Sequence, residues 1–145
     1  MTDSLYIVAL DGTDNSGRAL DFACGLAKET GAKLLLTHVI NWSGFQPVSA
    51  MEVAARPIDK GAEEKYTREK ILGPAKKAAE AKGVEAETWF NWGNPARAIN
   101  EQAEKKGASM IVMGRSGHGS IAELVLGSVS NALAHHSKIP VVLVP

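Results

Sequence analysis

Five short apolar runs alternate with longer amphipathic segments, and this alternation limits the possible folds more than any other feature of the sequence. The runs are largely aliphatic, as is typical of strands buried on both faces of a sheet. They cover residues 5–10, 33–40, 86–91, 109–113 and 141–144. The intervening segments predict helices over about 16–30, 61–82, 95–106 and 127–136. Strands that alternate with helices favour right-handed crossovers, and therefore a parallel sheet with helices on both faces.

The fourth run ends in a stretch rich in glycine. Gly114, Gly117 and Gly119 interrupt the chain here, and a helix resumes at Gly127. Glycine lets a backbone approach a ligand closely and adopt a positive φ. The helix that follows presents unpaired N–H groups and the positive end of its dipole. The sequence therefore predicts a phosphate site between this strand and this helix.

Two common phosphate motifs do not account for this stretch. A Walker A loop has the spacing of Gly114 and Gly119, but Ser120 stands where that loop requires lysine. Residues 117–122 fit the dinucleotide pattern GxGxxA, which also requires an acidic residue about twenty positions later, at the end of the next strand. Here the next strand ends at Val144 and Pro145, without a carboxylate.

A longer motif fits throughout: glycine, two residues, glycine, nine residues, and then Gly-Ser. Its members are Gly114, Gly117 and Gly127-Ser128. With this motif the chain resembles the universal stress protein family, in its ATP-binding branch. The resemblance covers nearly the whole chain, and it extends to Asp11 after the first run and to residues 37–40, 93–95 and 140–144.

The resemblance implies a fold and a ligand. The fold is a single α/β, Rossmann-like domain over residues 1–145, whose five parallel strands lie in the order 3-2-1-4-5. In that order the first and fourth strands flank the topological switch point, where ligands bind beyond the carboxyl ends of the strands. Asp11 and Gly114 end those two strands and should meet at one crevice. The implied ligand is ATP, alone or with Mg²⁺ held mainly by the phosphates.

The resemblance also implies which residues bind the nucleotide. Asp11 and the main chain of Val39 would flank the adenine and ribose, and the residues around Gly114 and Gly117 would lie along the ribose and phosphates. Backbone N–H and hydroxyl groups of residues 127–130 would donate to the β- and γ-phosphates. The complete set is Asp11, Val39, Met113, Gly114, Arg115, Gly117, His118, Gly127, Ser128, Val129 and Ser130.

Three of these residues have an alternative role. Asp11 also suits a turn-capping aspartate. Arg115 and His118 are the only cationic candidates in the glycine-rich stretch, and each could instead be an exposed loop side chain. Family members commonly carry Ser-His where this chain has Arg115-Ser116. The pair His135-His136 resembles a metal pair, but adjacent helical residues diverge by about 100°, so neither a metal site nor a catalytic residue is predicted.

A binding role is favoured over turnover. Phosphoryl transfer needs charge neutralisation by Lys, Arg or a metal, and a positioned nucleophile, and the glycine-rich stretch has no P-loop lysine. Together with the resemblance, this points to an ATP-binding sensor or regulator, of a stress response or of a membrane transporter. A slow ATPase and a nucleotide-independent dimerising scaffold are the alternatives.

The run over 141–144 would be an exposed apolar edge, and the resemblance implies a homodimer through it, alone or within a larger oligomer.

Composition argues against other classes of protein. Sixteen basic and sixteen acidic side chains give no net charge, which disfavours nucleic acid or an anionic membrane as the main partner. No run reaches the roughly 18 apolar residues of a membrane span, and no signal-peptide pattern is visible. The single cysteine, Cys24, lies in an apolar helical stretch and is expected to be buried. The expectation is a cytoplasmic protein without membrane insertion.

Three local features complete the sequence-based predictions. Gly73-Pro74 should kink or split the second helix, because proline lacks the N–H that the helix needs. Residues 41–59 form a long connection that either folds over the pocket or packs at an oligomer interface. The last helix should bury one apolar stripe, which consists of Val125, Val129, Ala132, Leu133 and His136.

Overall fold

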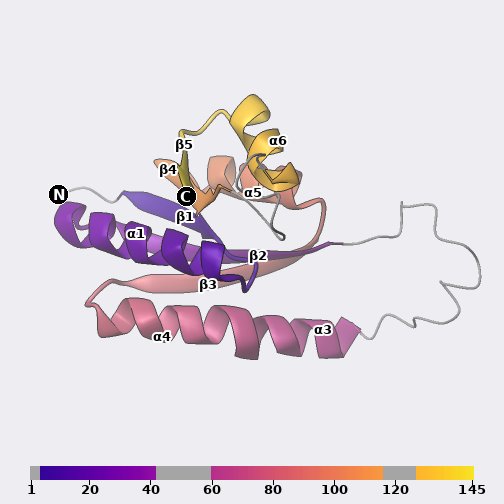
Figure 1. The fold of residues 1–145 in the computed structure, drawn as a ribbon, viewed down its shortest axis with the longest axis horizontal. Coiled ribbons are helices and arrows are strands. Elements are labelled where there is room, and N and C mark those ends of the chain that lie inside the picture. The colour runs from indigo at the N-terminus through magenta and orange to yellow at the C-terminus, as the bar shows by residue number, and fades with distance from the viewer. Residues whose placement is uncertain (1–3, 42–59, 116–126) are drawn as a thin grey trace, which may run out of the picture.

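The computed structural model describes residues 4–41, 60–115 and 127–145. Its centre is a sheet of five parallel strands in the order β3-β2-β1-β4-β5, with helices on both faces (Figure 1). The strands are β1 (Leu5–Ala9), β2 (Lys33–Asn41), β3 (Ala86–Gly93), β4 (Met110–Gly114) and β5 (Val141–Val144). This α/β, Rossmann-like architecture confirms the predicted fold class and strand order.

The three central strands are buried as their apolar sequences predict. Ile7, Leu36 and Ile111, one each from β1, β2 and β4, have no exposed surface. β1 pairs with β2 on one side and with β4 on the other, so that Ile7 lies opposite both Leu35 and Ile111. Burial on both faces explains why these runs are continuously apolar instead of alternating with polar residues.

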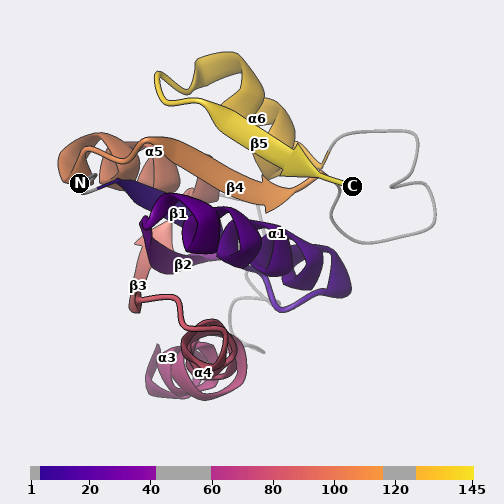
Figure 2. The same ribbon diagram turned by 90° about the vertical axis from the view of Figure 1, so that its left-hand side faces the viewer.

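Helices cover the two faces in separate layers. One face carries α1 (Asp14–Thr30) and a long helix composed of α3 (Lys60–Tyr66), η2 (Thr67–Leu72) and α4 (Gly73–Ala81). The other carries α5 (Pro95–Lys106) and α6 (Ser128–His136). In Figure 2, α6 lies near β5 at the top of the view, and α3 and α4 lie near β3 at the bottom. Because α1 leaves β1 on one face and α6 follows β4 on the other, the two connections diverge and open a crevice at the carboxyl ends of these strands.

Capping residues set the starts of two helices. α1 begins at Asp14, slightly earlier than predicted, because Thr13 is its N-cap and accepts a hydrogen bond from the backbone of the first turn. α5 begins as predicted, with Asn94 as the N-cap and Pro95 at the first helical position. Each of these two helices ends, as predicted, at a glycine in the left-handed conformation.

The discontinuity predicted at Gly73-Pro74 lies one turn earlier. Thr67–Leu72 is π-helical, and the regular helix α4 resumes at Gly73 with Pro74 in its first turn. Because α3, η2 and α4 form one continuous helix, Pro74 lies inside it and has no N–H to donate to the turn before it. The wide turn before Pro74 therefore takes the place of a kink at the proline itself.

The buried stripe predicted for the last helix is partly wrong. Leu133 is buried, but His136 is exposed and Val129 and Ala132 are only half-buried. Ser130 is buried one turn before Leu133, because its hydroxyl donates a hydrogen bond to the carbonyl of Gly114. Val125, in the same predicted stripe, and residues 42–59 of the long connection lie outside the described residues.

Cys24 is buried in the core, as predicted, and burial raises the pKa of its thiol. Within the described parts of the chain, no helix combines the length and apolar character that a bilayer crossing requires.

Candidate functional site

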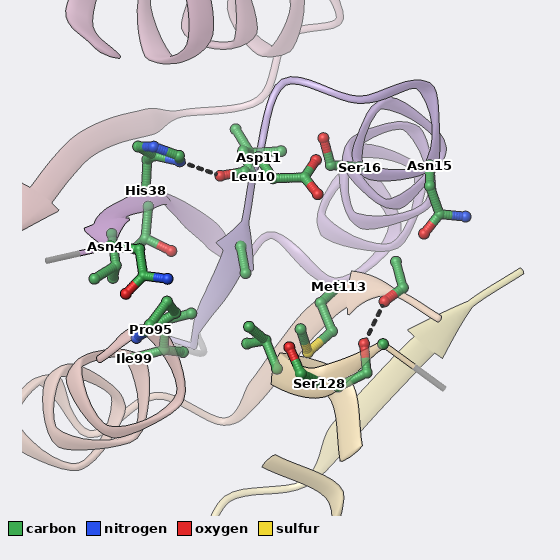
Figure 3. A pocket seen from close by; sticks show the side chains of 17 residues that line it. Leu10, Asp11, Asn15, Ser16, His38, Asn41, Pro95, Ile99, Met113 and Ser128 are labelled. Atoms are coloured by element: carbon green, nitrogen blue, oxygen red, sulfur yellow. Dashed lines mark hydrogen bonds between the residues drawn. The ribbon is translucent and has the colours of Figure 1, made fainter. Parts of the chain in front are cut away.

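The carboxyl ends of β1, β2 and β4 surround a cavity of about 350 Å³. Its walls come from the ends of these three strands and from the starts of α1, α5 and α6 (Figure 3). The lining residues are Ala9, Leu10, Asp11, Asn15, Ser16, Thr37, His38, Val39, Asn41, Pro95, Ile99, Met113, Gly114, Gly127, Ser128, Val129 and Ser130. The strand order thus brings Asp11 and Gly114 to one crevice, as predicted.

Asp11 lies in the turn that joins β1 to α1. Its Oδ1 accepts hydrogen bonds from the backbone N–H of Thr13 at 2.9 Å and from the Thr13 hydroxyl at 2.5 Å. Thr13 is the N-cap of α1, so the turn-capping role considered for Asp11 is present in the structure. A carboxylate has about four acceptor sites, and capping at Oδ1 is therefore compatible with a ligand contact from the same side chain.

The N-terminus of α6 opens toward the cavity. Its N-cap, Gly127, has no side chain to bond to the first turn, and the first intrahelical hydrogen bond runs from Asn131 N–H to the Gly127 carbonyl. The N–H groups of Ser128, Val129 and Ser130 precede that bond and have no intrahelical partner. They and the helix dipole favour an anion at this position.

Two predicted donors near α6 have protein partners. The N–H of Gly127 donates to the carbonyl of Arg115 at 3.2 Å. The Ser130 hydroxyl donates to the carbonyl of Gly114 at 2.8 Å, shown by a dashed line in Figure 3. These two bonds join the start of α6 to the end of β4, and the donors that remain in the first turn of α6 are the backbone N–H groups of residues 128–130.

Gly114 is required by a contact within the protein. A Cβ at this position would lie 2.7 Å from Cγ of Asn15 and closer still to Asn15 Oδ1. Asn15 belongs to the first turn of α1 and is buried. The glycine therefore lets α1 approach the end of β4, which the sequence-based reasoning attributed to the approach of a ligand.

The β2 side of the cavity contains residues that the sequence analysis missed. Nδ1 of His38 lies 2.7 Å from the carbonyl oxygen of Leu10, so it donates to that carbonyl (Figure 3). Asn41 ends β2, while Pro95 and Ile99 come from the first turns of α5. The positions of Asn41 and Pro95 were a usable signal, because one ends β2 and the other comes soon after β3, at the ligand-binding edge of the sheet.

The remaining predicted site residues fall into three groups. Val39 and Met113 are buried and line the cavity. Arg115 is exposed and is not among the lining residues; its N–H donates to the carbonyl of Val144 at 2.8 Å. Gly117 and His118 lie outside the described residues.

The described lining suits the binding of a neutral ring joined to an anion. It combines apolar side chains around Val39, Pro95 and Ile99 with bare N–H groups at α6, but it includes no lysine or arginine. Nor do the described residues contain a group of three or more His, Cys, Asp or Glu side chains that could hold a metal ion. The positive potential that favours an anion here therefore comes from the backbone amides and the dipole of α6.

Comparisons with known proteins agree with this architecture. The family model described as the universal stress protein family matches residues 7–145. Universal stress protein YxiE of Bacillus subtilis (strain 168) is 41% identical over 142 residues, which are 95% of this chain and 96% of that protein.

Two solved structures are similar over nearly the whole chain. Universal stress protein UspA from Lactobacillus plantarum has a TM-score of 0.79 at 18% identity, covering 100% of this chain and 99% of its own, which is a likeness of fold. A universal stress protein in complex with cAMP has a TM-score of 0.68 at 29% identity, covering 98% of this chain and 96% of its own. Because the family model spans residues 7–145 and YxiE is similar from end to end, the chain belongs to the universal stress protein family.

Proposed function

We propose that the cavity binds an adenine nucleotide, ATP in the first instance, and that the protein is a nucleotide-dependent regulator. The observation that carries the proposal is the N-terminus of α6, which has no side-chain cap and opens into the same cavity as Asp11. The similarity to a universal stress protein in complex with cAMP supports a nucleotide as the ligand. The family resemblance suggests a stress response or a membrane transporter as the regulated system.

The two ends of the cavity suit the two ends of a nucleotide. Phosphates would accept hydrogen bonds from the N–H groups of Ser128, Val129 and Ser130, each worth about 1.5–3 kcal/mol. The ribose and adenine would lie toward Asp11 and Val39. After association costs, a few such contacts and an enclosed base are consistent with a micromolar Kd, about −8 kcal/mol. Mg²⁺ that accompanies the nucleotide would be held mainly by the phosphates.

Regulation fits these side chains better than turnover. Rapid phosphoryl transfer requires positive groups around the γ-phosphate and a positioned nucleophile. The described lining has neither lysine nor arginine. A bound nucleotide that is turned over slowly can instead shift an equilibrium between conformations or assemblies by its differential affinity.

The first test identifies the ligand. Protein purified without added nucleotide is extracted with acid, the extract is analysed by chromatography, and binding of ATP, ADP and cAMP is measured by calorimetry. We expect intact ATP in the extract and the tightest binding for ATP. Absence of nucleotide from the extract together with absence of binding would contradict the proposal, and rapid accumulation of ADP would favour the ATPase.

A substitution at the N-cap of α6 tests the phosphate end. Gly127→Asp places a carboxylate where it caps the helix, which is neutral or stabilising by a few tenths of a kcal/mol, but its charge repels phosphate. We therefore expect unchanged or increased stability and at least a roughly tenfold loss of ATP affinity, about 1.4 kcal/mol. Gly127→Asn is the matched uncharged control and should lose much less affinity. Equal affinities of the two variants would place the phosphates elsewhere.

We also propose a homodimer through β5, alone or within a larger oligomer. This strand forms one edge of the sheet, and its four residues, all Val or Leu, are half-buried. An apolar edge strand favours pairing with another chain.

A further inference from the structure

The helix that covers β2 and β3 contains a wide turn beside the candidate site. Over Thr67–Leu72 the helix is π-helical, and the N–H of Gly73 donates to the carbonyl of Arg68, five residues earlier. Such turns are uncommon in proteins, and those that occur often lie near functional sites. Because none of the residues from 60 to 81 lines the cavity, any effect of this turn on the ligand must pass through other residues.

The wide turn is fixed by sequence and by burial. A Cβ at Gly73 would lie 2.7 Å from the carbonyl oxygen of Arg68, so only glycine fits there without a shift of the backbone. Thr67, Ile71 and Leu72 are all buried against the sheet, and the Thr67 hydroxyl donates to the carbonyl of Glu63 at 2.9 Å. The turn therefore aims a defined set of side chains, including Ile71, at the sheet.

Ile71 reaches the turn that carries Asp11. Gly12, the residue after Asp11, has a φ of +84°, and a Cβ there would lie 3.5 Å from Cγ1 and 3.7 Å from Cδ1 of Ile71. No other atom beyond its chain neighbours was found within 4 Å of that point in the described structure. Gly12 separates Asp11 from Thr13, whose N–H and hydroxyl both donate to Asp11 Oδ1. Ile71 thus borders the side-chain-free position at Gly12, in the middle of the three-residue turn that orients the Asp11 carboxylate.

We propose that Ile71, held by the π-helical turn, is a positioning residue for Asp11. Its side chain supports Gly12 from outside the cavity, so the carboxylate keeps both bonds to Thr13 and its direction toward the ligand. The position of the helix over residues 60–81 on the sheet thus affects the direction of the Asp11 carboxylate. The effect on the ligand rests on the proposed function, whereas the effect on the turn does not.

The first experiment measures the turn without any ligand. Exchange of the Thr13 amide hydrogen is followed by NMR in full-length protein, in the wild type and in Ile71→Ala, Ile71→Val and Leu72→Ala. We expect Ile71→Ala to speed exchange roughly two- to tenfold, the range that one net hydrogen bond represents. Ile71→Val keeps a γ-carbon against Gly12 and should restore most of the protection.

Leu72→Ala is the matched control. Leu72 is buried in the same cluster and the same π-helical turn, but it is not within 4 Å of a Cβ position at Gly12. Its truncation should lower the melting temperature at least as much as Ile71→Ala while leaving Thr13 exchange unchanged. Equal acceleration by both variants, or by neither, would overturn the positioning role.

The second experiment measures ATP binding by calorimetry in the same variants and in an Asp11→Ala background. We expect Ile71→Ala to weaken binding roughly two- to tenfold in the wild-type background and to have no further effect once Asp11 is removed. Additive losses would overturn the link through Asp11. A wild type that binds no nucleotide would refute the proposed function alone, because the Thr13 exchange rates still decide whether Ile71 positions the turn.

Discussion

Gly114 and Asn15 meet where β4 ends and α1 begins. Both residues line the cavity, and the Asn15 side chain occupies the space that any side chain at residue 114 would need. Packed interiors do not absorb an added methyl group easily, because neighbouring groups are already in van der Waals contact. The glycine therefore serves the packing of α1 against the end of β4, beside the cavity.

Gly114→Ala tests this contact. We expect the free energy of unfolding to fall by about 1–3 kcal/mol, the usual cost of overpacking, as measured by urea denaturation. Gly25→Ala is the matched control, since a Cβ at Gly25 in α1 has no other atom within 4 Å. It should be stabilising by about 0.5–1 kcal/mol, because alanine is a better helix former than glycine.

A second substitution separates the contact with Asn15 from other causes. Removing the Asn15 side chain in the double variant Gly114→Ala/Asn15→Ala should recover part of the stability that Gly114→Ala loses. The double variant could instead lose as much free energy of unfolding as the sum of the two single variants, or more. That result would show that overlap with Asn15 is not the reason for glycine at this position.

Sequence reasoning identified the part of the site that carries a motif. The meeting of Asp11 with Gly114 followed from the strand order, and the family resemblance added residues 127–130; the structure brings them to one cavity. Asn15 and His38 were missed because each meets a neighbour that only the folded chain supplies. His38, for example, meets Leu10 through the pairing of β1 with β2.

At the scale of elements, the five strands and most helix ends could be predicted, because burial on both faces and capping residues leave clear local patterns. The π-helical turn could not. Thr67, Ile71, Ala75 and Ala79 recur at every fourth position and are all buried, whereas a regular α-helix would rotate such a row by about 40° per step. A wider turn compensates for part of that rotation, so all four side chains face the sheet. This requirement arises only when the helix packs on the sheet.

Gly73→Ala tests the wide turn as an element. The new methyl group would lie against the carbonyl oxygen that accepts the π-helical hydrogen bond, so we expect a loss of about 1–3 kcal/mol in the free energy of unfolding. Gly17→Ala in α1 is the control, because the space around that Cβ is open. If Gly73→Ala had the same free energy of unfolding as Gly17→Ala, the helix could accommodate the added methyl group without cost.

At the scale of the whole molecule, the two edges of the sheet differ. β3 is shielded in part by Trp92, which bonds to Glu64 of α3 through Nε1 at 3.0 Å, and by Phe90, which lies 5.8 Å from the Arg68 guanidinium. β5 carries aliphatic side chains alone, and its partner within the described sheet is β4. With no net charge on the chain to oppose association, β5 is the edge at which we expect two copies to pair.

The outward backbone groups of β5 provide a test of that pairing. The carbonyls of Pro140 and Val144 accept hydrogen bonds from β4, at 2.8 Å each. Because the backbone groups of successive residues in a strand point to alternate sides, Val141 and Leu143 direct theirs away from β4. Leu143→Pro therefore removes an N–H on the open edge without removing a donor to β4. We expect a dimer of the wild type at micromolar concentration and a monomer of this variant, as measured by analytical ultracentrifugation. Leu143→Ala loses the same side chain but keeps the N–H, so it should remain largely dimeric. Dissociation of both variants to the same extent would assign the interface to side-chain packing. A monomeric wild type would contradict the proposed dimer.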